Sequence, residues 1–248
     1  MLPHFKYETY QDVRHNLALW STPLFVAAGL VFYFVALPPC ARATVRQFAA
    51  PVSSVWGPSA AVSIVALIVT AFAIEIVKVH DRIYDKYVIR WRHRYDSEFV
   101  LPHLLRPIWS EVRESFENEI AENPEQAMKR LYYPFVGDLE PKIRKNLLVR
   151  LYERITVYWL TQVCELLLAV IFLSMALARV SGPTDAAYRD RLLNTALVVG
   201  ILFVANRAWA RNALDGVRRA TLDEIQDILS RCGRELFDAV DELDIKRP

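Results

Sequence analysis

The sequence predicts an all-α integral membrane protein, with four transmembrane helices as two hairpins, a helical cytoplasmic insert and a C-terminal amphipathic helix. Hydrophobic residues make up 54% of the 248 residues, yet 23% are charged. A chain with both properties must keep its charges apart from its apolar runs. Four runs are indeed nearly free of charge, and they approach the length of about 20 residues that a helix needs to cross about 30 Å of hydrocarbon.

The four predicted spans cover residues 19–37, 60–77, 157–178 and 192–206. The first ends at Pro38-Pro39. The fourth is the shortest, so Arg191 and Arg207 must extend outward from its ends. A buried helix of a soluble protein would keep a polar stripe, whereas these runs are apolar on all sides. They also lack the alternation typical of barrel strands, so helices are expected.

The basic residues predict which side of the membrane each loop faces. All but five of the 30 Lys and Arg residues lie in residues 1–18, 78–156 and 207–248. The five others are Arg42, Arg46, Arg179, Arg189 and Arg191. By the positive-inside rule, the three basic segments and both chain ends are cytoplasmic in a cell inner membrane. The predicted divisions are an N-terminal segment 1–18, a first hairpin 19–77, a cytoplasmic domain 78–156, a second hairpin 157–206 and a cytoplasmic helix 207–248.

The N-terminal segment is expected to be retained and to lie at the membrane surface. It contains Glu8 and Asp12, which are unusual in a signal peptide, so the first span is predicted to be a signal anchor. Tyr10, Val13 and Leu17 share one helical face, which suits a helix lying in the headgroup layer.

The cytoplasmic insert is expected to be helical throughout. A stem continues from the second span over residues 78–99 and ends near Pro102, and an acidic helix covers about residues 104–122. A short third helix begins at Asn123-Pro124 and ends near residues 134–135. Residues 138–141 then open a helix that continues into the third span, since acidic residues and proline both suit a first turn.

Four basic residues recur every four positions along the stem and form one stripe: Arg82, Lys86, Arg90 and Arg94. The stripe has three interpretations. It pairs with the acidic second helix, it contacts anionic headgroups, or it forms a ring around a pore mouth that concentrates anions. The tail after Thr221 is acidic and is a further candidate partner for the stripe.

The tail is predicted to be a long amphipathic helix over residues 208–243. Its apolar residues recur in steps of three and four, which is coiled-coil spacing: Leu222, Ile225, Leu229, Cys232, Leu236, Ala239 and Leu243. This seam either docks on the insert of the same subunit or joins the tails of two subunits. A homo-oligomer is therefore expected.

Polar side chains inside the spans are the candidate functional residues, because lipid makes them costly. They are Glu165, Gln162, Glu75 and Asn206. Glu165 lies about 15 Å along the helix from Arg154. It either lines an ion or proton pathway or forms a structural hydrogen bond, with its carboxyl protonated by burial. Glu75 lies near an interface, where Lys78, Asn206 or Arg207 can meet it. Small residues four apart, such as Ala196 and Gly200, predict a close approach of helices.

Catalysis is not expected. The sequence has no Walker loop, GxSxG, HExxH or GxGxxG motif. His80-Asp81 is an isolated pair, and Cys40, Cys164 and Cys232 are read as packing residues, so no metal and no cofactor is expected. A net charge of +2 gives no indication of nucleic acid binding.

These patterns favour a homo-oligomeric channel- or pore-type inner-membrane protein that is gated or recruited through its cytoplasmic helical domain. Its layout is similar to that of flagellar-motor-type stator subunits and of small four-span membrane effectors of bacterial defence systems, although no motif of either group is present. One version is such an effector, which would depolarise the cell on opening. The alternative is a non-conducting membrane anchor or accessory subunit that recruits a protein partner.

Overall fold

The computed structural model describes residues 7–37, 42–44, 47, 58–72, 94–107, 123–137, 141–181 and 186–245. Throughout these segments every regular element is a helix, and none of them contains a strand. The all-α prediction is confirmed for this part of the chain.

The chain divides into two compact units. One unit, the polar unit, comprises Met1–Val13, Val79–Thr156 and Leu214–Pro248. The other, the apolar unit, comprises Arg14–Lys78 and Val157–Ala213. The predicted divisions at residues 18, 77, 156 and 206 concern the position of a bilayer, and they stay predictions.

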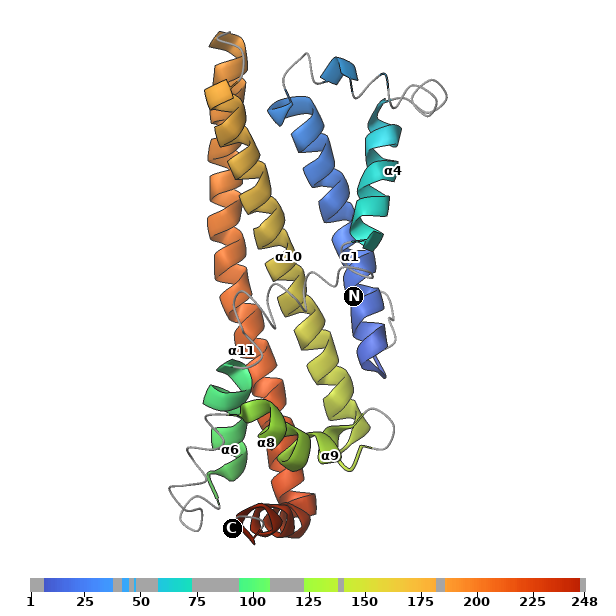
Figure 1. The fold of residues 1–248 in the computed structure, drawn as a ribbon, viewed down its shortest axis with the longest axis vertical. Helices are drawn as coiled ribbons and strands as arrows, with labels where there is room; N and C mark the ends of the chain where they lie inside the picture. The colour runs from blue at the N-terminus through green and yellow to red at the C-terminus, as the bar shows by residue number, and fades with distance from the viewer. Residues whose placement is uncertain are drawn as a thin grey trace. The chain divides into compact units, whose positions relative to one another are not determined.

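In the described part of the chain, the apolar unit takes residues from four helices of at least 14 residues. They are α1 (Tyr10–Val31), which continues into the π-helical turn η1 (Phe32–Ala36), α4 (Pro58–Ala71), α10 (Lys145–Ser181) and α11 (Ala186–Ile245). Within the unit, α10 and α11 run antiparallel and side by side (Figure 1). A short connection between Ser181 and Ala186 joins the two helices, so their antiparallel arrangement follows from the chain itself.

Among the described residues, three helical stretches are long and apolar enough to cross a membrane: Tyr10–Ala36, Lys145–Val180 and Ala186–Val240. They contain the first, third and fourth predicted spans. The second predicted span, residues 60–77, is only partly described. The described part contains most of α4, which has 14 residues and is given from Pro58 to Ala71. Four spans in two hairpins therefore stay a prediction.

The apolar unit is apolar on its outside as well as its inside. Its core contains Leu168, Ile171 and Met175 of α10 packed with Leu192 and Val199 of α11. Large apolar side chains also point outward: Leu197 is 67% exposed, Val204 69% and Ile68 64%. In water such a surface would be strongly unfavourable, so it indicates a lipid environment.

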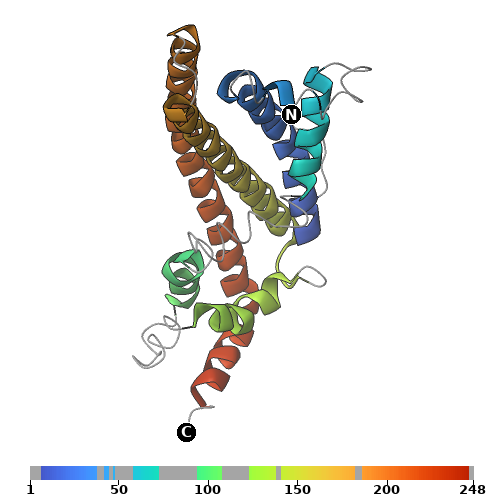
Figure 2. The ribbon, with the colours of Figure 1, turned by 45° about the horizontal axis from the view of Figure 1, so that its top comes forward.

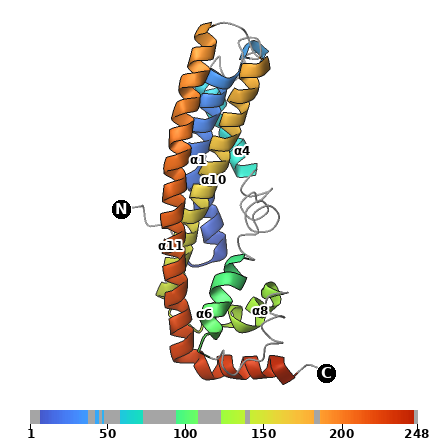
Figure 3. The ribbon, with the colours of Figure 1, turned by 90° about the vertical axis from the view of Figure 1, so that its left-hand side faces the viewer.

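The polar unit packs short helices around the second half of α11. They are α6 (Leu101–Leu105), α8 (Pro124–Leu131) and α9 (Tyr133–Val136). The π-helical turn η4 (Asp96–Val100) comes directly before α6. Figures 2 and 3 show α6 and α8 beside this part of α11. Leu101, Leu104, Leu131, Ile228 and Leu236 are completely buried in their shared core.

The sequence predicted that the stem helix ends near Pro102, but the helix continues past this residue. The chain is helical from Arg94 to Leu105, and Pro102 lies within this stretch. Proline lacks an N–H group and clashes with the preceding turn. The wider π turn at Asp96–Val100 comes directly before it and accommodates the proline. The predicted start of a new helix at Leu104 is therefore wrong, and most of the predicted acidic helix lies outside the described residues.

The next two predicted boundaries have different outcomes. The short helix α8 begins after Asn123, as predicted, and the Asn123 side chain accepts a hydrogen bond from the backbone N–H of Gln126. The long helix into the third span begins at Lys145, four residues after Pro141. The prediction that this helix continues into the third span is confirmed, because α10 extends to Ser181. Its later start results from a contact with an acidic residue of α11.

The structure bears in different ways on two expectations at the ends of the chain. Val13 and Leu17 are completely buried in a helix that continues to Val31, and a position of this segment in the headgroup layer stays a prediction. In α11 the backbone leaves helical geometry at Cys232, with φ −121° and ψ 15°. Figure 3 shows the last part of α11 turned away at this kink. An uninterrupted coiled-coil seam from Leu222 to Leu243 is excluded, because a straight seam cannot continue through the kink.

Candidate functional site

An ion pair links the two long helices inside the apolar unit. Nη1 of Arg207 donates to both carboxylate oxygens of Glu165, each at 3.0 Å. The Glu165 side chain is 19% exposed and that of Arg207 is 57% exposed. The sequence offered Arg207 as one of several candidate partners of Glu75, which lies outside the described residues. The sequence analysis did not consider the antiparallel register of α10 and α11. In this register, a residue about 20 positions before the connection between the helices lies beside a residue about 20 positions after it.

Buried polar groups continue from this ion pair along α10. The side-chain amide of Asn206 donates to the backbone carbonyl of Thr161 at 2.9 Å. The hydroxyl of Thr161 in turn donates to the carbonyl of Tyr158 at 2.6 Å. Gln162, one turn before Glu165, is also buried. The structure thus brings Glu165, Gln162 and Asn206 to one level of the α10–α11 pair.

Charged residues divide the two long helices of the apolar unit into uncharged stretches. From Arg179 to Glu165 is 14 residues, or about 21 Å of helix, and from Arg191 to Arg207 is 16 residues, or about 24 Å. Both lengths are shorter than the roughly 30 Å of a typical hydrocarbon core. Trp209 is 47% exposed just beyond Arg207, at a position typical of an interfacial tryptophan. Along α10, Glu165 lies 11 residues after Arg154 and 14 residues before Arg179, near the middle of a stretch that has no other charged residue.

Small residues contribute less to the contact than expected. A Cβ placed on Gly200 would meet nothing within 4 Å, so this glycine is not at a close approach of helices. Ala196 is half-buried and packs against the core of the apolar unit.

The polar unit contains a fully buried carboxyl group that sequence analysis missed. Glu224 has no exposed surface, and the hydroxyl of Tyr132 donates to its Oε2 atom. Its Oε1 atom has no hydrogen-bond partner in the described part of the chain. Burial raises the pKa of Glu224 to about 7, and the hydrogen bond from Tyr132 opposes this shift. The sequence could have indicated this burial, because Glu224 shares a helix face with Thr221, Ile225 and Ile228, which are buried on α11.

Tyrosines surround this carboxyl group. Tyr95 donates to the hydroxyl of Thr221 at 2.9 Å, one turn before Glu224. Burial raises the pKa of Tyr95, and it raises the pKa of Tyr132 further above its ordinary value. Both phenols therefore stay protonated across the physiological range and act as hydrogen-bond donors.

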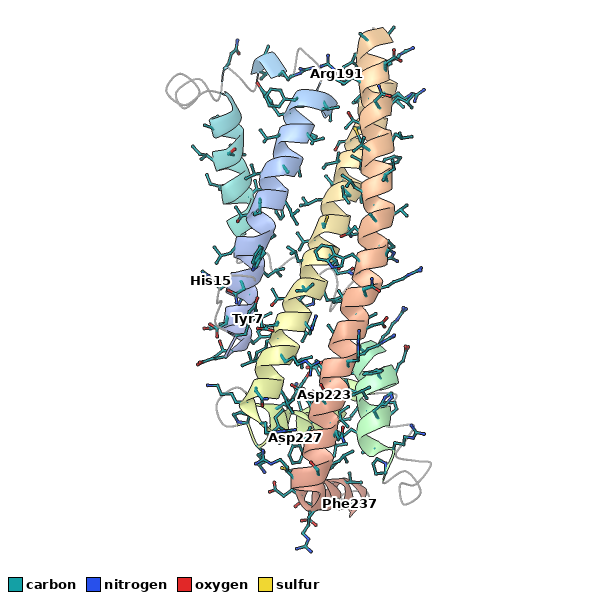
Figure 4. The ribbon with its side chains drawn as sticks, turned by 180° about the vertical axis from the view of Figure 1, so that it is seen from behind. Tyr7, His15, Arg191, Asp223, Asp227 and Phe237 are labelled. Atoms are coloured by element: carbon teal, nitrogen blue, oxygen red, sulfur yellow. The ribbon has the colours of Figure 1, made fainter. Side chains whose placement is uncertain are left out.

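Acidic residues of α11 hold the beginning of α10. Asp227, whose side chain is only 4% exposed, accepts from the backbone N–H of Arg144 at 2.9 Å and from Nε of Arg144 at 2.9 Å. Arg150 pairs with Asp223 at 2.8 Å, and Lys142 pairs with Glu235. Figure 4 shows Asp223 and Asp227 on successive turns of α11. Asp227 thus caps α10 from another helix, which explains why α10 begins later than local sequence predicted.

Similarity to known proteins assigns the chain to a family. The YmfE protein family model matches residues 14–239, which is most of the chain. The chain belongs to the YmfE protein family. The matched range includes parts of both compact units. No curated protein and no solved structure matches the chain.

The remaining predicted site residues of this YmfE family member are only partly described. Arg82, Lys86 and Arg90 lie outside the described residues, and Arg94 is exposed. In the tail, Ile225 and Leu236 are buried in the core of the polar unit, and Leu229 packs against that core. Leu222 is 37% exposed, and the side chain of Leu243 is not described. Self-association through this seam stays a prediction.

Proposed function

We propose that the chain is a multi-pass inner-membrane protein that holds a helical unit at the cytoplasmic membrane surface, where this unit recruits a protein partner. On this proposal α1, α10 and α11 are three of four spans, and the predicted span at residues 60–77, which includes most of α4, is the remaining one. Both chain ends are cytoplasmic, because most basic residues lie in the segments on that side. Function then belongs to the polar unit, and the apolar unit serves as its anchor.

The observation that carries this proposal is the ion pair between Glu165 and Arg207. A conduction path needs polar groups that are available to water or ions. In the described part of the apolar unit, Glu165 is instead paired with Arg207, and the amide nitrogen of Asn206 bonds to Thr161. The outward-facing side chains are largely apolar. This arrangement suits a hairpin stabilised by internal polar contacts, and it supports an anchoring role.

The polar unit has the features of a defined binding module. Its core is closed by Leu101, Leu131 and Leu236, and the ion pairs of Arg144 and Arg150 connect the start of α10 to α11. A unit with this much internal packing presents a fixed surface to a partner, which lowers the entropic cost of binding.

A pore-forming homo-oligomer is the second candidate, and one observation favours it. The Oδ1 atom of Asn206 is buried and has no hydrogen-bond partner among the described residues. Gln162 is buried nearby at the same level. In an oligomer whose spans rearrange, these groups would provide a polar constriction, and opening would depolarise the cell as in a membrane effector.

Ion flux through purified protein in liposomes separates the two functions. The anchor predicts no flux above empty liposomes for the natural chain, at any membrane potential or at pH 5 to 8. The Glu165→Ala variant serves as a probe, and Asp238→Ala, which removes an exposed carboxylate of the polar unit, is the matched control. Flux that depends on protein and changes in Glu165→Ala but not in the control would establish the pore and overturn the anchor.

A further inference from the structure

An apolar groove lies between α10 and α11 close to the connection that joins them. Its volume is about 370 Å³, and its lining includes Phe172, Ala176 and Arg179 of α10 with Leu193, Ala196 and Leu197 of α11. All of these residues belong to the apolar unit. The two alanines leave the space open, while Phe172, Leu193 and Leu197 form its exposed apolar walls.

Arg179 is the only charged residue of the lining. Its side chain is exposed, and it forms no ion pair with any described residue. Arg189 and Arg191 lie on the first turns of α11 at the same end of the hairpin, and Figure 4 shows Arg191 there. An apolar groove that ends at a guanidinium group with no ion-pair partner in the described part of the chain is complementary to an amphiphile with an acyl chain and an anionic head.

We propose that this groove binds one acyl chain of an anionic phospholipid from the surrounding bilayer, and that Arg179 binds the phosphate of the lipid. The site rests on the proposed placement of α10 and α11 in the membrane. Phe172 and Leu197 flank the chain, and Ala176 and Ala196 allow it to lie between the helices. Guanidinium and phosphate groups match in charge and hydrogen-bond geometry.

The same charges disfavour a second copy of the chain as the occupant. All copies in one membrane have the same orientation, so a neighbouring copy would place its own Arg179, Arg189 and Arg191 at the same level. Like charges at close range repel, and they do so more strongly near hydrocarbon than in water. A phospholipid brings the opposite charge together with the apolar chain.

Native mass spectrometry of the purified protein in detergent tests this site. Phosphatidylglycerol is added as the anionic probe and phosphatidylcholine as the neutral one. The natural chain is expected to retain one phosphatidylglycerol more strongly than phosphatidylcholine. Arg179→Gln should weaken phosphatidylglycerol retention about fivefold, which is the usual contribution of one basic side chain at an anionic surface. Ala176→Phe fills the groove and should reduce retention of both lipids.

Arg189→Gln is the matched control, because it removes the same charge at the same end of the hairpin but outside the groove. It should retain phosphatidylglycerol like the natural chain, and unchanged helix content by circular dichroism should show that each variant is folded. Equal retention by Arg179→Gln and the natural chain would overturn the site, as would a dimer without bound lipid. A chain that fractionates with soluble proteins in the absence of detergent would instead overturn the proposed function.

Discussion

Glu224 combines complete burial with a single hydrogen bond to its carboxyl group. Burial penalises the charged form, and the neighbouring Asp223 adds to the effect, while the hydroxyl of Tyr132 opposes it. Asp96 and Tyr95, on the segment around η4, and Arg218 on α11 are the other ionisable groups of this cluster. Below a pH of about 7 the carboxyl is neutral in the folded protein, and above it the polar unit contains a buried charge.

This carboxyl should make the polar unit less stable as the pH rises. Its pKa is raised from 4.5 to about 7 on folding, so the folded state binds the proton more tightly. The stabilisation is fully present below pH 4.5 and is lost as the pH rises through 7. Between pH 5 and pH 8 the loss amounts to roughly 2 to 3 kcal/mol. Glu224→Gln should remove it, as measured by chemical denaturation in detergent at both pH values.

Asp238→Asn, at an exposed position of the same helix, is the control for this prediction. It should follow the pH dependence of the natural chain. If the unfolding free energies of Glu224→Gln and the natural chain differ by the same amount at pH 5 and pH 8, the proposed titration of Glu224 is wrong.

At the scale of helices, Asp227 determines where α10 begins. Its carboxylate accepts from the backbone N–H of Arg144, immediately before the first helical residue, and from the Arg144 side chain. The first turn of a helix has N–H groups without partners inside the helix, so an acidic side chain there satisfies one of them and interacts favourably with the helix dipole.

Replacing this cap should loosen the first turn of α10. Asp227→Ala is expected to destabilise the protein by about 1 to 2 kcal/mol, the range found for lost caps and charged hydrogen bonds. Hydrogen exchange should become faster at the amides of residues 145–148. Asp238→Ala, which removes an exposed carboxylate from the same helix, should leave their exchange unchanged. Unaltered exchange in Asp227→Ala would show that α10 begins there for another reason.

Much of the helical structure could be predicted from sequence, and the failures have specific causes. The three long apolar helices and the start of α8 at Asn123 follow from local residues alone. The start of α10 does not, because its cap comes from Asp227, 82 residues after Lys145. Pro102 misled for a related reason, since the π turn that accommodates it has no recognised local signature.

The candidate site was predictable in composition but not in pairing. Glu165, Gln162 and Asn206 stood out because polar residues are rare in apolar runs. Their arrangement depended on the register of α10 against α11, which sequence periodicity does not give. The buried Glu224 was grouped with surface acids, because charge alone does not show which side of a helix faces the core.

For the molecule as a whole, the apolar length between the charged levels of α10 and α11 is about 21 to 24 Å. A bilayer with a thicker core must thin locally around such helices, at a cost of fractions of a kcal/mol for each ångström. The protein should therefore be more resistant to thermal unfolding in vesicles with 14-carbon acyl chains than in vesicles with 18-carbon chains. An equal or higher unfolding temperature in the thicker bilayer would show that the charged residues at these levels do not mark its edges.

The central proposal is that the apolar hairpin spans the membrane and that the polar unit lies in the cytoplasm. Labelling of single cysteines with a membrane-impermeant thiol reagent tests this, after the three natural cysteines have been replaced. We expect Ala187→Cys to react in intact spheroplasts, Ser230→Cys to react only after permeabilisation, and Val198→Cys to react in neither case. Reaction of Val198→Cys in folded protein, or of Ser230→Cys in intact spheroplasts, would contradict it.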